Sequence, residues 1–127
     1  MLAHSDVIAF LSTADISRAR TFFADTLDLP VVSESPYALA FDANGTMLRV
    51  TPVGEVATPG YTVLGWSVAD IGATVRGLSG RGVEFIRYDG MDQDAAGIWT
   101  TPGGDMVAWF KDPDGNTLSV TQFIGDF

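Results

Sequence analysis

Met106–Gln122, read M-V-A-W-F-K-D-P-D-G-N-T-L-S-V-T-Q, is the stretch that decides the fold. An apolar run that ends at Phe110 and a β-rich run that begins at Thr117 flank the turn-forming segment Asp112–Asn116. The proline of that segment has a fixed φ suited to an early turn position, and its glycine or asparagine adopts a positive φ at little cost. The pattern predicts a β-hairpin.

A fainter copy of this hairpin lies earlier in the chain. Asp42–Val50 aligns with Asp112–Val120 at an offset of 70 residues (112 minus 42), with Asp, Gly, Leu and Val matching. The starts of two expected helices also repeat, because Ala14-Asp15-Ile16 aligns with Ala69-Asp70-Ile71. The sequence therefore predicts a duplicated architecture.

Each half is expected to read strand, helix and three further strands. Asp15 and Asp70 are expected to cap the helices, because apolar residues follow each at helical spacing. The first helix is expected to end near Pro30, and Gly80 and Gly82 to stop the second. The expected strands are 7–12, 31–35, 37–42 and 47–53 in the first half, and 63–68, 83–88, 106–110 and 117–123 in the second, with a small strand at Ile98–Thr101 inside an insertion.

The predicted fold class is α+β, with two paired βαβββ modules whose mixed sheets form a curved trough. We expect a single domain, residues 1–127, in which a linker of about residues 54–60 joins a first module of about residues 1–54 to a second of about 61–127. A length of 127 residues suits one compact core.

Composition and charge argue against several kinds of partner and location. The net charge is −9, which disfavours nucleic acid and anionic lipid as partners. No apolar run approaches the roughly 20 residues of a membrane helix. The chain has no cysteine and no signal-peptide pattern at its start, so we expect a cytoplasmic location without disulfides or thiolate metal sites.

With these residues in view, the chain resembles the vicinal oxygen chelate superfamily, which includes glyoxalase I, extradiol dioxygenases and bleomycin-resistance proteins. The resemblance is carried by Ser12–Phe23 (S-T-A-D-I-S-R-A-R-T-F-F), Ser67–Ile71 (S-V-A-D-I) and Trp109–Val120 (W-F-K-D-P-D-G-N-T-L-S-V). It implies paired βαβββ modules, usually in a homodimer.

The resemblance also locates the metal site of the family enzymes, which carry up to four ligands inside the trough. The family spacing places those four positions at Ile8, Arg49, Val63 and Ser119. Divalent metals in such sites need imidazole or carboxylate donors, so none of the four residues suits a metal. We therefore expect no metal and no cofactor.

Other candidate ligands are weaker still. His4 has no partner His or Cys, and a terminal, structural or solvated role is the alternative to a ligand role. An acidic group formed by Asp89, Asp92, Asp94 and Asp105 has the oxygen donors of a hard-cation site but lacks the spacing of a calcium loop, and a solvated acidic loop is the alternative.

Strand alternation predicts which residues line the trough. Arg49 is a candidate clamp for a carboxylate or phosphate, with an internal acidic partner or a position at the rim as the alternative. Trp99 is a candidate lid over an aromatic ligand, with core packing or a dimer contact as the alternative. Trp109 and Phe110 point to opposite faces, so one of them is expected in the trough. The predicted ligand-binding residues are Ile8, Phe10, Met47, Arg49, Val63, Trp99, Trp109, Ser119 and Thr121.

These features predict a metal-free protein that binds a small anionic or aromatic molecule in the trough, and that forms a homodimer. The alternative is a lyase- or isomerase-type enzyme of the same superfamily, metal-independent or working through non-standard residues. A third hypothesis is an interaction or regulatory module without a ligand. Binding is favoured over catalysis because no Asp, Glu or His falls on the strand faces assigned to the trough.

Overall fold

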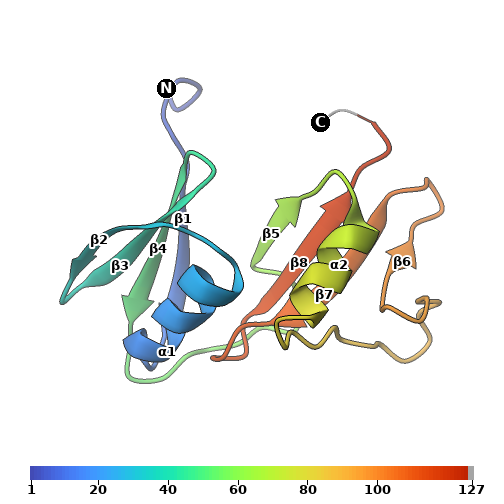
Figure 1. The fold of residues 1–127 in the computed structure, drawn as a ribbon. Helices are drawn as coiled ribbons and strands as arrows, with labels where there is room; N and C mark the ends of the chain where they lie inside the picture. Colours follow the sequence, from blue (N-terminus) through green and yellow to red (C-terminus); the bar gives the residue numbers. More distant parts are fainter. Residues whose placement is uncertain (126–127) are drawn as a thin grey trace. The chain divides into compact units, whose positions relative to one another are not determined.

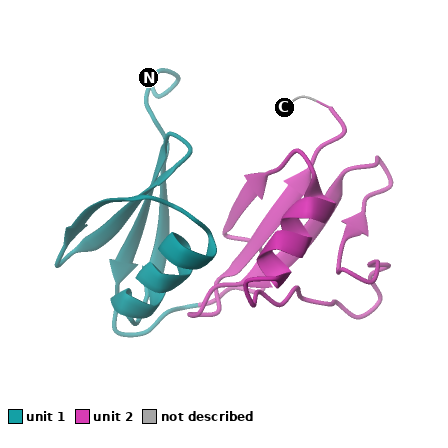
Figure 2. Ribbon diagram, in the orientation of Figure 1, with its two compact units in different colours: residues 1–57 teal, residues 58–127 magenta. Residues whose placement is uncertain are grey.

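The protein is described by a computed structural model over residues 1–125, so residues 126 and 127 of the expected second module lie outside the described part. The chain divides into two compact units, residues 1–57 and 58–127 (Figure 2). Each unit contains a four-stranded mixed sheet and the element order β-α-β-β-β, which confirms the predicted α+β fold class (Figure 1).

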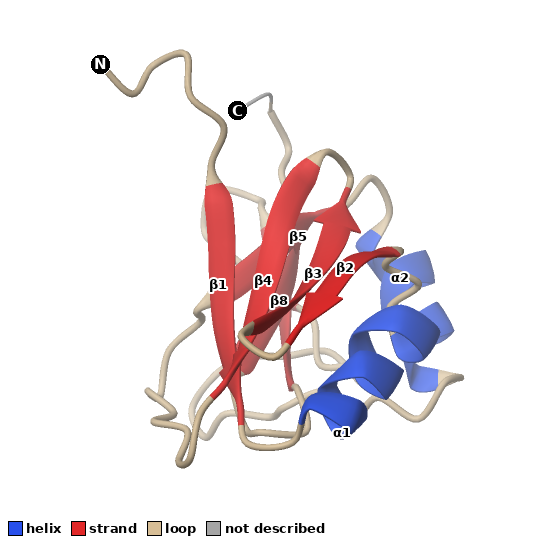
Figure 3. Ribbon diagram, turned by 90° about the vertical axis from the view of Figure 1, so that its left-hand side faces the viewer, coloured by secondary structure: helices blue, strands red, loops and turns tan. Residues whose placement is uncertain are grey.

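The first unit has the sheet order β1-β4-β3-β2, with β1 parallel to β4 and the other neighbours antiparallel. Its elements are β1 (Ile8–Thr13), α1 (Ile16–Arg20), the π-helix η1 (Thr21–Thr26), β2 (Val31–Ser35), β3 (Ala38–Ala43) and β4 (Thr46–Pro52). The helical segment covers one face of this sheet (Figure 3). Phe23 is fully buried there and packs on Phe41 of β3, with 5.7 Å between the ring centroids.

The first helix begins as expected but does not continue as an α-helix. The Asp15 side chain accepts a hydrogen bond from the Arg18 backbone N–H, which is an N-cap. From Thr21 onward the backbone widens into a π-helix, and Leu27 N–H donates to the carbonyl of Phe22. The spacing of apolar residues does not distinguish a π-helical turn, which holds about one more residue, from the end of an ordinary α-helix. The sequence therefore predicted the helical segment but not its change from α-helix to π-helix.

The second unit has the sheet order β5-β8-β7-β6, with β5 parallel to β8. Its elements are β5 (Leu64–Ser67), α2 (Ile71–Ser79), β6 (Trp99–Thr100), β7 (Met106–Lys111) and β8 (Thr117–Gln122). Asp70 caps α2 by accepting from the Ala73 N–H. Ile71 and Val75 on α2 are buried over one face of the sheet, which also buries Phe110, Leu118 and Val120.

The prediction of a strand over residues 83–88 is wrong. Phe85 forms only an isolated bridge with Phe110, and Ile86 N–H donates to the carbonyl of Trp109 at 2.8 Å. β6 pairs with the beginning of β7, opposite Met106 and Val107. The insertion thus supplies β6, which pairs with the beginning of β7. Residues 83–88 contact the same edge of β7 only farther along, at Trp109 and Phe110.

The turn after β7 is held by one carboxylate. Asp112 is buried, and it accepts hydrogen bonds from Asp114 N–H, Asn116 N–H and Asn116 Nδ2 at 2.8 to 3.0 Å. Burial raises the pKa of the Asp112 carboxyl above its ordinary value, although its hydrogen bonds act in the opposite direction. In the copy of this turn, exposed Asp42 accepts one such bond, from Gly45 N–H at 2.7 Å.

No helix within residues 1–125 is long and apolar enough to cross a membrane.

The two copies of the turn predict unequal sensitivity to mutation. Asp112→Ala removes the acceptor for three buried or half-buried donors, and we expect a loss of about 3 kcal/mol in the free energy of unfolding. Asp42→Ala removes a single exposed bond and serves as the matched control, with an expected loss of about 0.5–1 kcal/mol. Urea denaturation followed by circular dichroism measures both. Equal losses for the two variants would contradict the structural role assigned to Asp112.

Candidate functional site

Each sheet has one face covered by its helix and one helix-free face. In the first unit, Ile8 lies opposite Met47, and Phe10 lies opposite Arg49, in the parallel pairing of β1 with β4. Their neighbours Leu11, Leu48 and Val50 are buried in the helix-covered core. Strand alternation therefore places Ile8, Phe10, Met47 and Arg49 on the helix-free face. Phe10 is 62% exposed there, and Ile8 is 46% exposed.

Arg49 is half-buried between Phe10 on β1 and Ala40 on β3. It makes no ion pair with any residue in the described range 1–125, so the internal acidic partner considered from the sequence is not found. Asp42 lies opposite Met47 and so shares this face, which strand-by-strand reasoning missed. Its carboxylate is already bound by the turn at Gly45.

In the second unit, the centre of the helix-free face is Ser119. Gly65 on β5 and Trp109 on β7 lie on either side of it in register, and Thr121 is the next residue of β8 on the same face. Ser119 is only 7% exposed, yet its hydroxyl forms no hydrogen bond with the described residues. A Cβ at position 65 would lie 2.7 Å from Ser119 Oγ, so the absence of a side chain at Gly65 makes room for this hydroxyl.

Three aromatic rings lie together around Trp109, the register neighbour of Ser119 on β7. Trp99 and Trp109 pack with their ring centroids 6.2 Å apart and tilted by 30°, and the Tyr88 ring meets Trp109 edge-on at 5.4 Å. Trp109 is the member of the Trp109–Phe110 pair on the helix-free face, because Phe110 is buried in the core against Trp66. The rings present a half-buried aromatic surface suited to a planar apolar group.

Trp99 does not occupy a lid. It belongs to the edge strand β6, opposite Val107, and is held against Trp109. Trp99 is therefore a fixed part of the sheet face rather than the lid that the sequence suggested. Val63 comes just before β5, where its N–H donates to the carbonyl of Thr117, and its side chain is 39% exposed.

The four positions predicted to correspond to the metal ligands of the family enzymes do not carry side chains that suit a metal. Ile8 and Val63 have no donor atom, Ser119 offers a neutral hydroxyl, and Arg49 is a fixed cation. Within residues 1–125 there is no group of three or more His, Cys, Asp or Glu side chains placed to hold a metal ion. His4 is exposed before β1.

Two of the four acidic residues considered as a cation site accept hydrogen bonds from backbone N–H groups. Asp94 Oδ1 accepts from Ala96 N–H and Ile98 N–H at 2.9 Å, and Asp105 Oδ1 accepts from Ile124 N–H at 3.0 Å. Asp89 and Asp92 are exposed. These contacts favour a structural and solvated role for the four carboxylates over a cation site.

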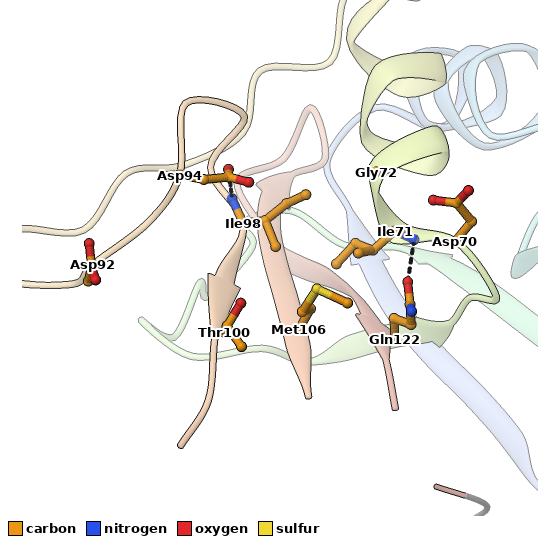
Figure 4. A pocket seen from close by; sticks show the side chains of 9 residues that line it. All are labelled: Asp70, Ile71, Gly72, Asp92, Asp94, Ile98, Thr100, Met106 and Gln122. Carbon is orange, nitrogen blue, oxygen red and sulfur yellow. Dashed lines mark hydrogen bonds between the residues drawn. The ribbon is translucent and has the colours of Figure 1, made fainter. Parts of the chain in front are cut away.

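The helix-covered side of the second unit has a hollow of about 600 Å³ near the start of α2 (Figure 4). Its apolar lining comes from Ile71, Ile98 and Met106. Its main polar groups are already engaged, since Gln122 accepts from the Ile71 N–H, Asp70 caps α2 and Asp94 holds its loop. The hollow thus offers few free polar groups to orient a ligand.

The architecture defines the class of protein first: two βαβββ modules, each with its first and last strands parallel and adjacent. Residues 4–120 match the family model described as Glyoxalase/Bleomycin resistance protein/Dioxygenase superfamily. The chain therefore belongs to this superfamily, which confirms the resemblance seen in the sequence. No curated protein sequence matches the chain significantly.

Solved structures support the fold. A glyoxalase family protein from Enterococcus faecalis is similar with a TM-score of 0.76 at 16% identity, covering 96% of this chain and 100% of that one. A lactoylglutathione lyase from Agrobacterium tumefaciens is similar with a TM-score of 0.73 at 15% identity, covering 94% of this chain and 95% of that one. A superfamily member from Sphaerobacter thermophilus gives 0.70 at 20% identity, covering 92% and 97%. At these identities the likeness shows the fold alone.

The close approach of Gly65 to Ser119 predicts an energetic coupling between the two positions. Gly65→Ala places a methyl group against Ser119 Oγ, and we expect it to cost about 1 kcal/mol more in the wild type than in a Ser119→Ala background. A double-mutant cycle of urea unfolding free energies measures this difference. A coupling near zero would mean that the Ser119 hydroxyl does not occupy the space beside Gly65.

Proposed function

We propose that the protein binds a small planar molecule, aromatic or anionic, without a metal ion. The observation that supports this most is the Trp99–Trp109 pair beside the Ser119 hydroxyl, on a sheet face that no helix of its unit covers. A stacked aromatic surface holds a ring, and a hydroxyl without an internal partner orients a polar substituent.

The residue types on this face favour binding over acid–base catalysis. The strand residues are Gly65, Ser67, Trp99, Val107, Trp109, Lys111, Thr117, Ser119 and Thr121. None carries a carboxylate or an imidazole, the groups that most often act as general base. The proposal thus follows the metal-free binding members of the superfamily rather than its metal-dependent enzymes.

The predicted trough between the two modules, the homodimer and the cytoplasmic location are parts of the same proposal. In it, the first module contributes Ile8, Phe10, Met47 and Arg49, while the second contributes Val63, Trp99, Trp109, Ser119 and Thr121. Arg49 suits the anionic end of a ligand because it is half-buried and has no ion-pair partner in residues 1–125.

Tryptophan substitution tests the aromatic surface. We expect 4-nitrobenzamide, a neutral nitroaromatic, to quench the tryptophan fluorescence of the wild type saturably, because its ring stacks on Trp109. Trp109→Leu should weaken binding by about tenfold, which corresponds to roughly 1.4 kcal/mol of lost stacking. Isothermal titration calorimetry gives the affinity independently of the fluorophore.

Trp66→Phe is the matched control, since Trp66 packs on Phe110 in the helix-covered core. It should leave the affinity unchanged even if it lowers stability. If Trp66→Phe and Trp109→Leu weaken binding equally, or if no nitroaromatic binds the wild type, the proposed surface is wrong.

Metal removal tests the other half of the proposal. We expect dialysis against EDTA to leave the affinity for 4-nitrobenzamide within twofold of its initial value, because the four family ligand positions lack metal donors. Elemental analysis of the protein before dialysis should give well below one equivalent of zinc, iron, manganese or nickel. A stoichiometric metal whose loss abolishes binding would refute the metal-free assignment.

A further inference from the structure

A small cavity adjoins the aromatic surface inside the second unit. It has a volume of about 150 Å³ and lies between the segment Thr58–Gly60 and the side chains of Ile86, Tyr88, Lys111 and Thr117. Since a water molecule takes about 30 Å³ of liquid volume, the cavity has room for roughly five waters or one carboxylate or phosphate group. It is thus large enough for the polar end of a ligand whose ring lies outside it.

Tyr88 connects this cavity with the aromatic surface. It lines the cavity and packs edge-on against Trp109, with 5.4 Å between the ring centroids. Lys111 and Trp109 are alternate residues of β7, and Thr117 and Ser119 are alternate residues of β8, so all four lie on the helix-free face. A ring on Trp109 therefore has this cavity next to it along the same two strands.

The cavity carries a positive charge without a compensating carboxylate. Lys111 is the sole charged residue among those that line it, and it forms no ion pair with the described residues 1–125. The nearest acidic residue in sequence, Asp112, accepts three hydrogen bonds inside its turn. In a chain of net charge −9, a lining with one ammonium and no carboxylate selects for an anion.

Thr117 adds a hydroxyl to the lining of the cavity. Its side chain is 3% exposed, and its hydroxyl forms no hydrogen bond with the described part of the chain. No fully buried side-chain polar atom of the described residues lacks a hydrogen-bond partner, so this hydroxyl still reaches solvent and can donate to an acceptor bound in the cavity. The Tyr88 hydroxyl also makes no hydrogen bond within residues 1–125.

From these four observations we propose that the cavity binds the carboxylate of an aromatic acid whose ring packs on Trp109. Lys111 attracts the carboxylate, and Thr117 donates a hydrogen bond to it. The inference rests on the proposed function and extends it, because it names the ligand class as aromatic carboxylates and assigns their anionic end to Lys111 in the second unit rather than to Arg49 in the first.

The test compares a charged and a neutral ligand of the same shape. We expect the wild type to bind 4-nitrobenzoate at least tenfold more tightly than 4-nitrobenzamide, as measured by calorimetry and by fluorescence quenching. Lys111→Met should reduce the affinity for 4-nitrobenzoate about tenfold and leave that for 4-nitrobenzamide unchanged. Thr117→Val keeps the side-chain shape and should weaken 4-nitrobenzoate binding about threefold.

Two arginine variants serve as controls. Arg76→Met removes one positive charge from α2, on the other side of the same sheet, and should leave the preference for 4-nitrobenzoate intact. Arg49→Met tests the competing anion site. Loss of the preference in Arg49→Met but not in Lys111→Met, or an equal loss in Arg76→Met and Lys111→Met, would overturn the assignment.

The remaining outcomes separate the two proposals. If 4-nitrobenzamide binds and 4-nitrobenzoate binds no more tightly, the carboxylate site is refuted while the proposed function stands. If neither compound binds, both are refuted. Tighter binding of 4-nitrophenyl phosphate than of 4-nitrobenzoate would replace carboxylate by phosphate as the preferred group and so overturn the ligand class named here.

Discussion

The buried carboxylate of Asp112 fixes the turn between β7 and β8, and the arrangement of the second unit depends on that turn. Three donors from Asp114 and Asn116 converge on it, so the chain reverses at one defined place. The reversal sets the register that brings Trp109 opposite Ser119 and Lys111 opposite Thr117. Because side chains alternate between faces, a slip of one residue would move the whole set to the other side of the sheet. The site is thus a consequence of the turn.

The same scaffold supports different chemistry depending on a few inward residues. At the four positions where the sequence predicts the metal ligands of family enzymes to fall, this chain has two aliphatic side chains, a hydroxyl and a guanidinium. Removal of donors leaves the hydrogen-bonded frame intact, since the strands pair through backbone groups and the core lies on the helix-covered face. The fold and the chemistry of the site therefore vary independently, and membership in the superfamily does not by itself assign a reaction.

The sequence predicted the features that depend on local chemistry. The D-P-D-G-N turn, the two Asp caps and the strand alternation around Arg49 and Ser119 agree with the structure, because each follows from neighbouring residues. Features that depend on competition for space were missed. Residues 83–88 look β-compatible, but the insertion gives part of the β7 edge to β6. The position of Trp99 likewise depends on which segment pairs with the edge of β7.

The cavity at Lys111 was not predictable for a similar reason. In the sequence, Lys111 is one more residue of a turn motif, while Thr58–Gly60 belongs to an expected linker and Tyr88 to an expected strand. Only their packing shows that three distant segments enclose one space. Strand alternation does assign Lys111 and Thr117 to the face of Trp109, so the partial signal was present.

The surroundings of Lys111 in this cavity strengthen its attraction for a bound anion compared with that of an ordinary exposed lysine. The net charge of −9 repels anions at long range, but charges farther apart than the Debye length, about 8 Å at physiological ionic strength, are largely screened. Within that distance, an ammonium beside a hydroxyl interacts with a partly desolvated carboxylate more strongly than it does in water. The protein therefore combines a weak, screened repulsion of anions with local selection, so an acid is retained only when its ring and its carboxylate fit the same face together.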